Sequence, residues 1–236
     1  MPTSGTYLWS PDLAEMVDDA FERCKVDPST LALSHIQSAR RSINYMLSEW
    51  AAMDVGHDWR IEQFTQALVL GTAAYVINPA TANGRIIDII QVALRRSGSD
   101  TPIYDMSRQE YLDIPNKTTQ GRPSRYFLAK NNDLITLTLW SVPENSTDTL
   151  IIDAVRKFQD HDTAAVSPDT TYYMREAFVA GLAAKLAVKF APNDRVGMLD
   201  AMAKRSLDIG NSAQRERGDI VITPGSGYGR RGRRRR

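Results

Sequence analysis

The chain has 236 residues, 42% hydrophobic and 24% charged, which is typical of one soluble globular domain or a closely packed pair of domains. No apolar run approaches the roughly 20 residues needed to cross a bilayer, and the N-terminus lacks the basic and apolar regions of a secretory signal, so we expect no membrane contact. The single cysteine, Cys24, excludes an internal disulfide and a zinc site built on cysteine pairs.

Residues 10–53 predict two amphipathic helices. Ser10-Pro11 is a favourable helix start, and an apolar stripe at helical spacing follows it to Cys24. A second helix is predicted over about residues 30–53. Two such helices in succession suggest an antiparallel pair. The two stripes consist of Leu13, Met16, Val17, Ala20, Phe21 and Cys24, and of Ile36, Ala39, Ile43, Met46, Leu47 and Trp50.

The middle of the chain favours strands. Residues 59–77 predict a hairpin broken at Gly71, Asn83-Gly84 predicts a turn, and residues 86–94 predict a buried strand. Residues 107–110 match a capping box, and an extended loop is expected over 115–123. Residues 125–130 and 134–140 flank a polar tip and predict a second hairpin, with one apolar face. A last strand is predicted over 149–158.

Helical patterns return after Ser167-Pro168. An alanine-rich helix is expected over residues 170–190 and a final helix over about 194–213. The order helices, strands, helices predicts an α+β fold whose N- and C-terminal helices form a bundle around an inserted β-rich region. We expect the boundaries to be 1–57 and 167–213 for the helices, 58–166 for the β-rich region and 214–236 for a flexible, extended tail.

The tail dominates the distribution of charge. Residues 1–229 contain 23 basic and 28 acidic residues, a net charge of −5, whereas the last seven residues carry +6. Guanidinium groups bind phosphate or carboxylate, so the tail is a candidate contact to DNA or to an acidic partner. Its six arginines are Arg230, Arg231, Arg233, Arg234, Arg235 and Arg236.

The sequence predicts no catalytic, metal or cofactor residues. Asp160-His161-Asp162 has metal-ligand chemistry, but a solvated polar turn between a strand and a helix is the favoured interpretation. Cys24 lies on the apolar stripe, which favours a buried structural thiol over a nucleophile. Asp105, Glu110 and Asp113 could perform acid–base chemistry, but the capping box already explains Glu110. Nucleophile-elbow, phosphate-loop and dinucleotide motifs are absent from the sequence.

Five segments in order resemble one known family, over about residues 11–215. They are SARRSINYMLSEWAAM at 38–53, which contains Trp50; the stretch from Phe64 to Tyr75; SRQEYLDIPNKTTQGRPSRY at 107–126; LWSVP at 139–143; and YYMREAFVAGLAAKLAVKF at 172–190. Together they resemble the head-to-tail adaptors of short-tailed bacteriophages, the packaged-DNA stabilisation and tubular tail proteins. Ser141 departs from the proline often found there. The family positions in the third and fourth segments are Tyr111, Pro115, Lys117, Gly121, Arg122, Pro123, Tyr126, Trp140 and Pro143.

This resemblance implies a structural virion protein. Identical subunits, typically twelve, would form a ring under the portal protein, extend the channel for packaged double-stranded DNA, help retain the genome and offer a docking surface to nozzle or other tail proteins. It implies location in the virion neck, after assembly in the host cytoplasm, and no enzymatic activity. Two alternatives remain: a DNA-binding protein acting through its arginine tail, and a virion-associated cell-wall hydrolase using Glu110 or Asp113.

Overall fold

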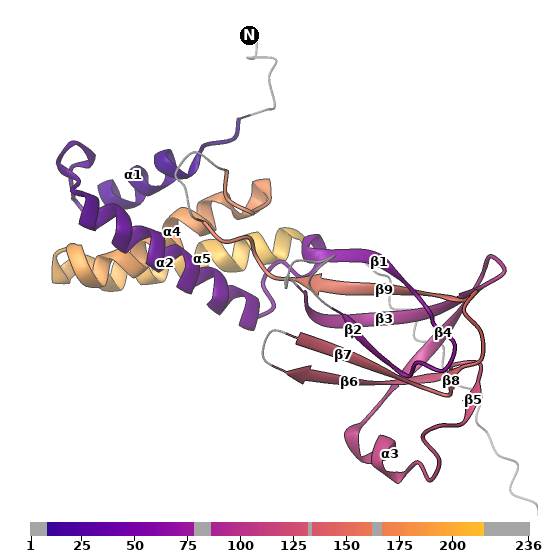
Figure 1. The fold of residues 1–236 in the computed structure, drawn as a ribbon. Helices are drawn as coiled ribbons and strands as arrows, with labels where there is room; N and C mark the ends of the chain where they lie inside the picture. The colour runs from indigo at the N-terminus through magenta and orange to yellow at the C-terminus, as the bar shows by residue number, and fades with distance from the viewer. Residues whose placement is uncertain (1–8, 78–85, 132–133, 162–166, 215–236) are drawn as a thin grey trace, which may run out of the picture.

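The protein has a mixed α+β fold, as predicted, in which the long helices lie beside a large curled sheet (Figure 1). The computed structural model describes residues 9–77, 86–131, 134–161 and 167–214. The helices are α1 (Leu13–Arg23), α2 (Leu33–Ala52), α3 (Arg108–Asp113), α4 (Arg175–Phe190) and α5 (Asn193–Gln214). The strands are β1 (Ile61–Ala67), β2 (Ala74–Ile77), β3 (Ile86–Arg96), β4 (Ser99–Met106), β5 (Gln120–Gly121), β6 (Arg125–Asn131), β7 (Leu134–Trp140), β8 (Val142–Pro143) and β9 (Thr149–Arg156).

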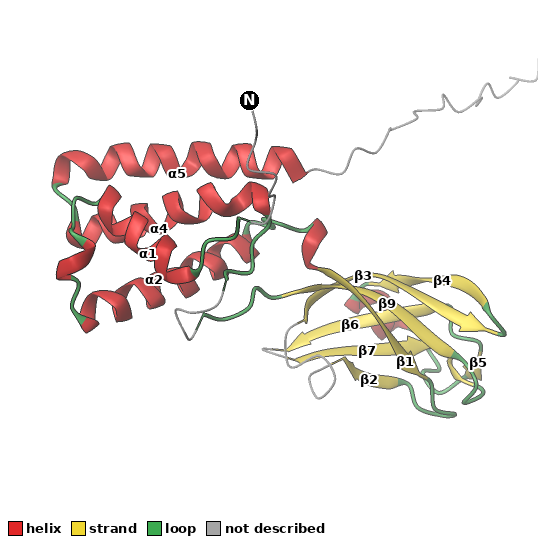
Figure 2. Ribbon diagram, turned by 90° about the horizontal axis from the view of Figure 1, so that it is seen from above, coloured by secondary structure: helices red, strands yellow, loops and turns green. Residues whose placement is uncertain are grey.

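The N-terminal helices bury the predicted stripes. Helix α1 begins later than predicted, because Asp12 rather than Ser10 is its N-cap and accepts a hydrogen bond from the Glu15 N–H at 2.8 Å. Ile36 is the exception on the second stripe and is 39% exposed. Helices α1 and α2 both pack chiefly against α4, because its alanines, Ala177, Ala180, Ala183 and Ala187, let the backbones approach closely (Figure 2).

The C-terminal helices are α4 and α5, and the predicted start of the first one was wrong. Ser167-Pro168 precedes irregular chain, and α4 begins only at Arg175, after a 3-10 turn over Tyr172–Met174. The final helix is confirmed, since α5 covers the predicted residues and packs along α4.

The seven-stranded sheet has the order β1-β9-β3-β4-β6-β7-β2, and β5 and β8 form a small parallel pair. The hairpin predicted for residues 59–77 was wrong: β1 pairs with β9 and β2 with β7, at opposite edges of the sheet. Residues 68–73 cross between these edges, with the Leu68 N–H donating to the Asp148 carbonyl and the Leu139 N–H to the Ala73 carbonyl. Strand β1 pairs with the apolar strand β9, which is distant in the sequence, and not with the strand that follows it.

The second hairpin is confirmed, with β6 and β7 antiparallel and Tyr126 opposite Leu139. Its predicted apolar face is buried, since Ile135, Leu137 and Leu139 are at most 4% exposed. Asn132 and Asp133 of its tip, and the Asn83-Gly84 turn, lie outside the described residues.

Strand β4 had no counterpart in the prediction. Its sequence lacks an alternating apolar pattern, and only Ile103 and Met106 are buried in it. A tight turn creates it: Ser97 and Gly98 both have positive φ, 51° and 80°, which reverses the chain after β3. The strand then runs parallel to β6.

Two hydrophobic cores meet at a polar joint. One core lies among the long helices and the other inside the curled sheet. Between them Arg60 is fully buried: its Nε donates to the Gly56 carbonyl at 3.3 Å, and its guanidinium lies 4.7 Å from the centre of the Phe158 ring. Arg156, at the end of β9, forms a two-pronged ion pair with Asp169 on the way to α4.

The predicted solvated turn at Asp160-His161-Asp162 needs a correction. His161 is buried, 3% exposed, with its ring edge-on to Phe178. Its backbone N–H donates to the Asn44 side chain at 3.2 Å, which draws this segment onto α2. Asp162 lies outside the described residues.

Candidate functional site

Nine of the ten positions that carry the resemblance lie in or next to α3, β5, β8 and the adjoining ends of β6 and β7, away from the long helices (Figure 1). We call α3 with residues 114–126 and 140–148 the distal platform. Trp50 is the exception, because it is buried in the helical core and contacts Phe158 and Phe178 edge-on. The distal platform is therefore the first candidate site.

The platform begins with the predicted capping box. The Ser107 hydroxyl accepts a hydrogen bond from the Glu110 N–H at 3.2 Å, and the Glu110 carboxylate accepts one from the Ser107 N–H at 2.7 Å. The bond from the Ser107 N–H holds the pKa of Glu110 below its usual value. This carboxylate is thus a helix cap, as predicted.

Tyr111 and Lys117 fasten α3 to the sheet. The Tyr111 ring stacks on Phe127 of β6, with ring centres 5.2 Å apart and planes 12° apart. The Lys117 ammonium lies 5.3 Å from the centre of the Tyr111 ring and donates to the Leu112 and Ile114 carbonyls at 3.1 and 2.9 Å. Lys117 therefore satisfies carbonyl groups at the end of α3 while covering the aromatic stack.

A second set of family positions holds the loop after α3. Gly121 of β5 pairs with Pro143 of β8, and the Trp140 indole N–H donates to the Asn116 carbonyl at 3.4 Å. A Cβ atom on Gly121 would lie in ordinary van der Waals contact with the Ser141 side chain, 3.5 Å away. Tyr126 is buried, and burial raises its pKa, assisted by Asp105 and Asp88. Pro123 is buried, whereas Pro115 is exposed.

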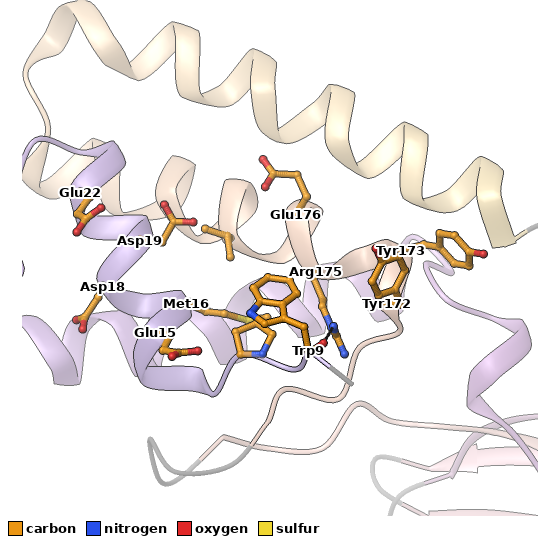
Figure 3. Close-up of a pocket in the computed structure, with 12 residues that line it drawn as sticks. Trp9, Glu15, Met16, Asp18, Asp19, Glu22, Tyr172, Tyr173, Arg175 and Glu176 are labelled. Carbon is orange, nitrogen blue, oxygen red and sulfur yellow. Dashed lines mark hydrogen bonds between the residues drawn. The ribbon is translucent and has the colours of Figure 1, made fainter. Parts of the chain in front are cut away.

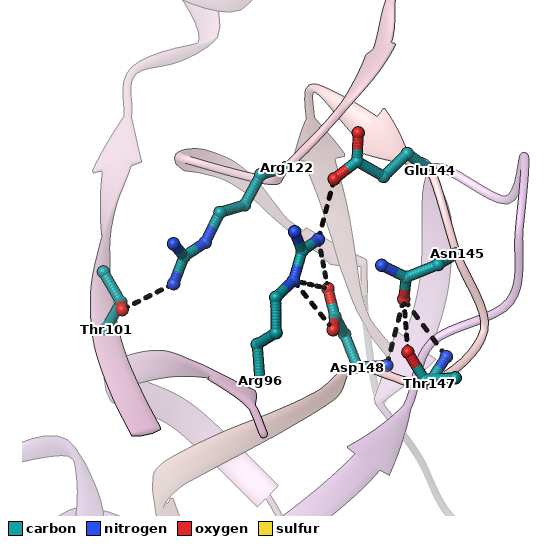
Figure 4. A network of polar contacts seen from close by, with 7 residues as sticks. All are labelled: Arg96, Thr101, Arg122, Glu144, Asn145, Thr147 and Asp148. Atoms are coloured by element: carbon teal, nitrogen blue, oxygen red, sulfur yellow. Dashed lines mark hydrogen bonds and ion pairs between the residues drawn. The ribbon is translucent and has the colours of Figure 1, made fainter. Parts of the chain in front are cut away.

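An arginine–carboxylate network fixes residues 144–148 (Figure 4). Arg96 Nε lies 3.0 and 2.9 Å from the two oxygens of Asp148, which is 2% exposed, and the guanidinium also reaches Glu144 at 2.9 Å. These carboxylates raise the pKa of Arg96. Arg122 lies beside the network and donates to the Thr101 hydroxyl at 2.7 Å. Arg96 and Asp148 were missed from sequence, because they are 52 residues apart and belong to no local motif.

Exposed apolar side chains lie on and beside this hydrogen-bonded platform. Val69, Leu70 and Leu112 are 53%, 54% and 59% exposed, and Tyr104 is also exposed. The first two lie close to the platform, because the Leu70 N–H donates to the Ser146 hydroxyl and the Gly71 N–H to the Pro143 carbonyl. Exposed apolar groups on an ordered surface are typical of protein–protein interfaces.

The helical end offers two further surfaces. Helix α5 buries only Leu199 and Gly210 and exposes an apolar stripe of Met198, Met202 and Ile209. Beside α1 and the start of α4 lies an open groove of about 770 Å³ (Figure 3). It is lined by aromatic rings and carboxylates, namely Trp9, Pro11, Glu15, Met16, Asp18, Asp19, Glu22, Tyr172, Tyr173, Arg175, Glu176 and Val179.

The remaining candidates from the sequence are also placed. Cys24 is buried, burial raises its pKa, and its thiol donates to the Ala183 carbonyl at 3.4 Å, so its predicted burial is confirmed. Across the described ranges, His, Cys, Asp and Glu residues form no group of three or more that could hold a metal ion. The same ranges contain no helix long and apolar enough to cross a membrane. The tail arginines lie outside the described residues.

Comparisons of the sequence with models of known protein families and with curated proteins gave no match. The fold and the platform therefore define the class on their own: a mixed α+β protein with exposed apolar side chains on the part of its sheet around α3, β5 and β8.

Proposed function

We propose that the chain is a head-to-tail adaptor subunit of a short-tailed bacteriophage, with its terminal helices as a bundle that forms the ring. The observation that carries the proposal is the distal platform, where family positions spread over residues 111–143 become one braced surface. Bracing of this kind favours a docking surface, because pre-ordered groups lose little entropy on binding.

The two ends of the molecule suit two kinds of contact. The platform, remote from the long helices, is the docking surface for nozzle or other tail proteins. The α5 stripe of Met198, Met202 and Ile209 supplies apolar surface for a neighbouring subunit. Contacts between different faces of identical subunits give a ring when the rotation between neighbours closes, and a twelve-fold ring would match the portal beneath which it docks and enclose the DNA channel.

The direct test mixes the purified chain with its cognate portal ring and images the product by negative-stain electron microscopy. The expected product is a second ring stacked on the portal with the same rotational symmetry. A chain that stays monomeric and unattached beside intact portal rings overturns the proposal.

A pair of variants tests the lateral contact. Met202→Lys places a charge in the α5 stripe and should reduce ring formation on the portal by about ten-fold, because burying an unpaired charge is costly. Gly197→Lys is the matched control: it adds the same side chain to α5, where a Cβ meets open space, and should leave ring formation unchanged. Equal ring yields from both variants would remove the stripe from the proposed interface.

A further inference from the structure

The groove beside α1 carries chemistry that the adaptor proposal does not use. Its walls are aromatic: Trp9, Tyr172 and Tyr173 are 70%, 69% and 60% exposed (Figure 3). Among the described residues that line it, five are carboxylates and Arg175 is the one cation. Guanidinium groups bind to both aromatic ring faces and carboxylates.

The groove already holds one guanidinium in this way. The Arg175 guanidinium lies 5.6 Å from the Trp9 ring centre and 5.4 Å from that of Tyr172. It also donates to the Trp9 carbonyl. The site therefore recognises arginine within the fold, and large ring faces remain uncovered.

Three of the carboxylates remain without a cation. Asp19 and Glu176 share the Arg23 guanidinium, at 3.0 and 2.7 Å. Within the described ranges, no ion pair involves Glu15, Asp18 or Glu22, which are all exposed. Their spacing of three and four residues puts them on one face of α1, where like charges repel. Cations bound there would relieve this repulsion.

The chain itself carries the complementary segment. Residues 230–236 contain six arginines, in a chain whose other residues sum to a net charge of −5. The described chain ends near the groove: the Gln214 side chain donates to the Thr171 hydroxyl, and Thr171 precedes the groove residue Tyr172. The fifteen residues between Gln214 and Arg230 can span up to about 50 Å, whereas α1 is only about 16 Å long.

We propose that the arginine segment, residues 230–236, binds this groove on its own chain, with guanidinium groups paired to Glu15, Asp18 and Glu22 and stacked on the exposed rings. A tether this short makes the contact intramolecular. The inference does not depend on the adaptor function.

The test is photocrosslinking in the full-length chain. The photoreactive residue p-benzoylphenylalanine replaces Tyr228, beside the arginines, and the products are mapped by mass spectrometry. An equal mixture of ¹⁵N-labelled and unlabelled protein separates contacts within one chain from contacts between copies. Crosslinks are expected to α1 and to residues 172–176, within one isotopic copy, and to weaken as the salt concentration rises.

Matched variants test the chemistry of the contact. The triple variant Glu15→Gln, Asp18→Asn, Glu22→Gln should lower the yield of these crosslinks roughly five- to ten-fold, because each exposed ion pair changes an equilibrium by about two-fold. The triple variant Asp105→Asn, Asp113→Asn, Asp208→Asn removes the same charge at exposed positions outside the groove and should leave the yield unchanged. Circular dichroism confirms that both are folded.

Three results overturn the proposal: crosslinks scattered away from the groove, crosslinks only between differently labelled copies, or equal yields from the two triple variants. Crosslinks between copies would instead make the groove a contact between subunits. Scattered crosslinks that disappear when duplex DNA is added would assign the tail to nucleic acid.

Discussion

Asp169 links the two cores through Arg156, and its charge stabilises the fold. Burial raises the pKa of Asp169, but the hydrogen bonds from Arg156 and from the Gln159 N–H outweigh burial and hold the pKa below its usual value. A carboxyl whose pKa is depressed in the folded state contributes stability above its unfolded pKa of about 3.9 and loses it as the pH falls through the folded value.

We therefore expect Asp169→Asn to lower the free energy of unfolding at pH 7 by about 3 kcal/mol, because it leaves the Arg156 guanidinium, 12% exposed, without its main partner. The difference from wild type should shrink below pH 4. Urea unfolding at several pH values measures this, with Asp105→Asn as the exposed control. A deficit that is the same at pH 7 and pH 3 would show that charge is not the cause.

His161 predicts a second pH dependence. Burial lowers its pKa, against the opposing effects of Asp169 and Asp160, and its Nε2 has no hydrogen-bond partner among the described residues. A histidine whose folded pKa is lowered binds its proton more readily in the unfolded chain. Stability that is present above the unfolded pKa of about 6.5 is therefore lost as the pH falls below it.

The expected loss below pH 6.5 is up to about 1.4 kcal/mol for each pH unit, until the folded pKa is reached. His161→Gln removes the titrating group and should flatten this part of the stability curve. Stability curves of parallel slope for wild type and His161→Gln would contradict the assignment.

At the scale of single elements, α3 is short and its core contacts are few, so its cap matters. Ser107→Ala removes the hydroxyl that accepts the Glu110 N–H and should destabilise α3 by about 1 kcal/mol. Amide hydrogen exchange should show about five-fold faster exchange in α3 and unchanged rates in β6. Ser124→Ala, at an exposed position outside the helix, serves as the control; equal effects from both variants would rule out the cap as the cause.

Elements with a local cause were predictable from the sequence. The apolar residues of α1 repeat with the period of a single helix. In the β6–β7 hairpin, apolar and polar residues alternate, and polar residues separate the two strands in the sequence. The predicted pairing of β1 with β2 was wrong because the two strands pair instead with β9 and β7, which lie far away in the sequence. Strand β4 was missed because only two of its side chains are buried.

The parts of the candidate site also differ in whether their cause is local in the sequence. The capping box of α3 was visible in four consecutive residues. The Arg96–Asp148 pair and the aromatic groove bring together residues from separate elements, so no spacing in the sequence could predict them. His161 was misassigned because its polar neighbours indicate a turn, whereas its own side chain packs against Phe178.

On the scale of the whole molecule, the two cores should respond separately to cavities. Leu186 in the helical core and Leu137 in the sheet core are both fully buried. Each leucine-to-alanine change should cost about 3 kcal/mol. Leu186→Ala should accelerate amide exchange mainly in α1, α2 and α4, and Leu137→Ala mainly in β2, β6 and β7. Uniform acceleration by both variants would mean that the polar joint at Arg60 couples the cores into one cooperative unit.

The position of β9 beside β1 has a consequence for how the chain reaches its fold. During synthesis on the ribosome, β1 is complete about 80 residues before β9, its partner among the described strands, has been made, and the interval between α1 or α2 and α4 is longer still. Such high contact order slows folding, because a long loop must close before any of these contacts forms. Until residues 149–156 are made, the edges of β1 and β3 that pair with β9 are unpaired, so the period in which the nascent chain is open to aggregation is set by one late strand.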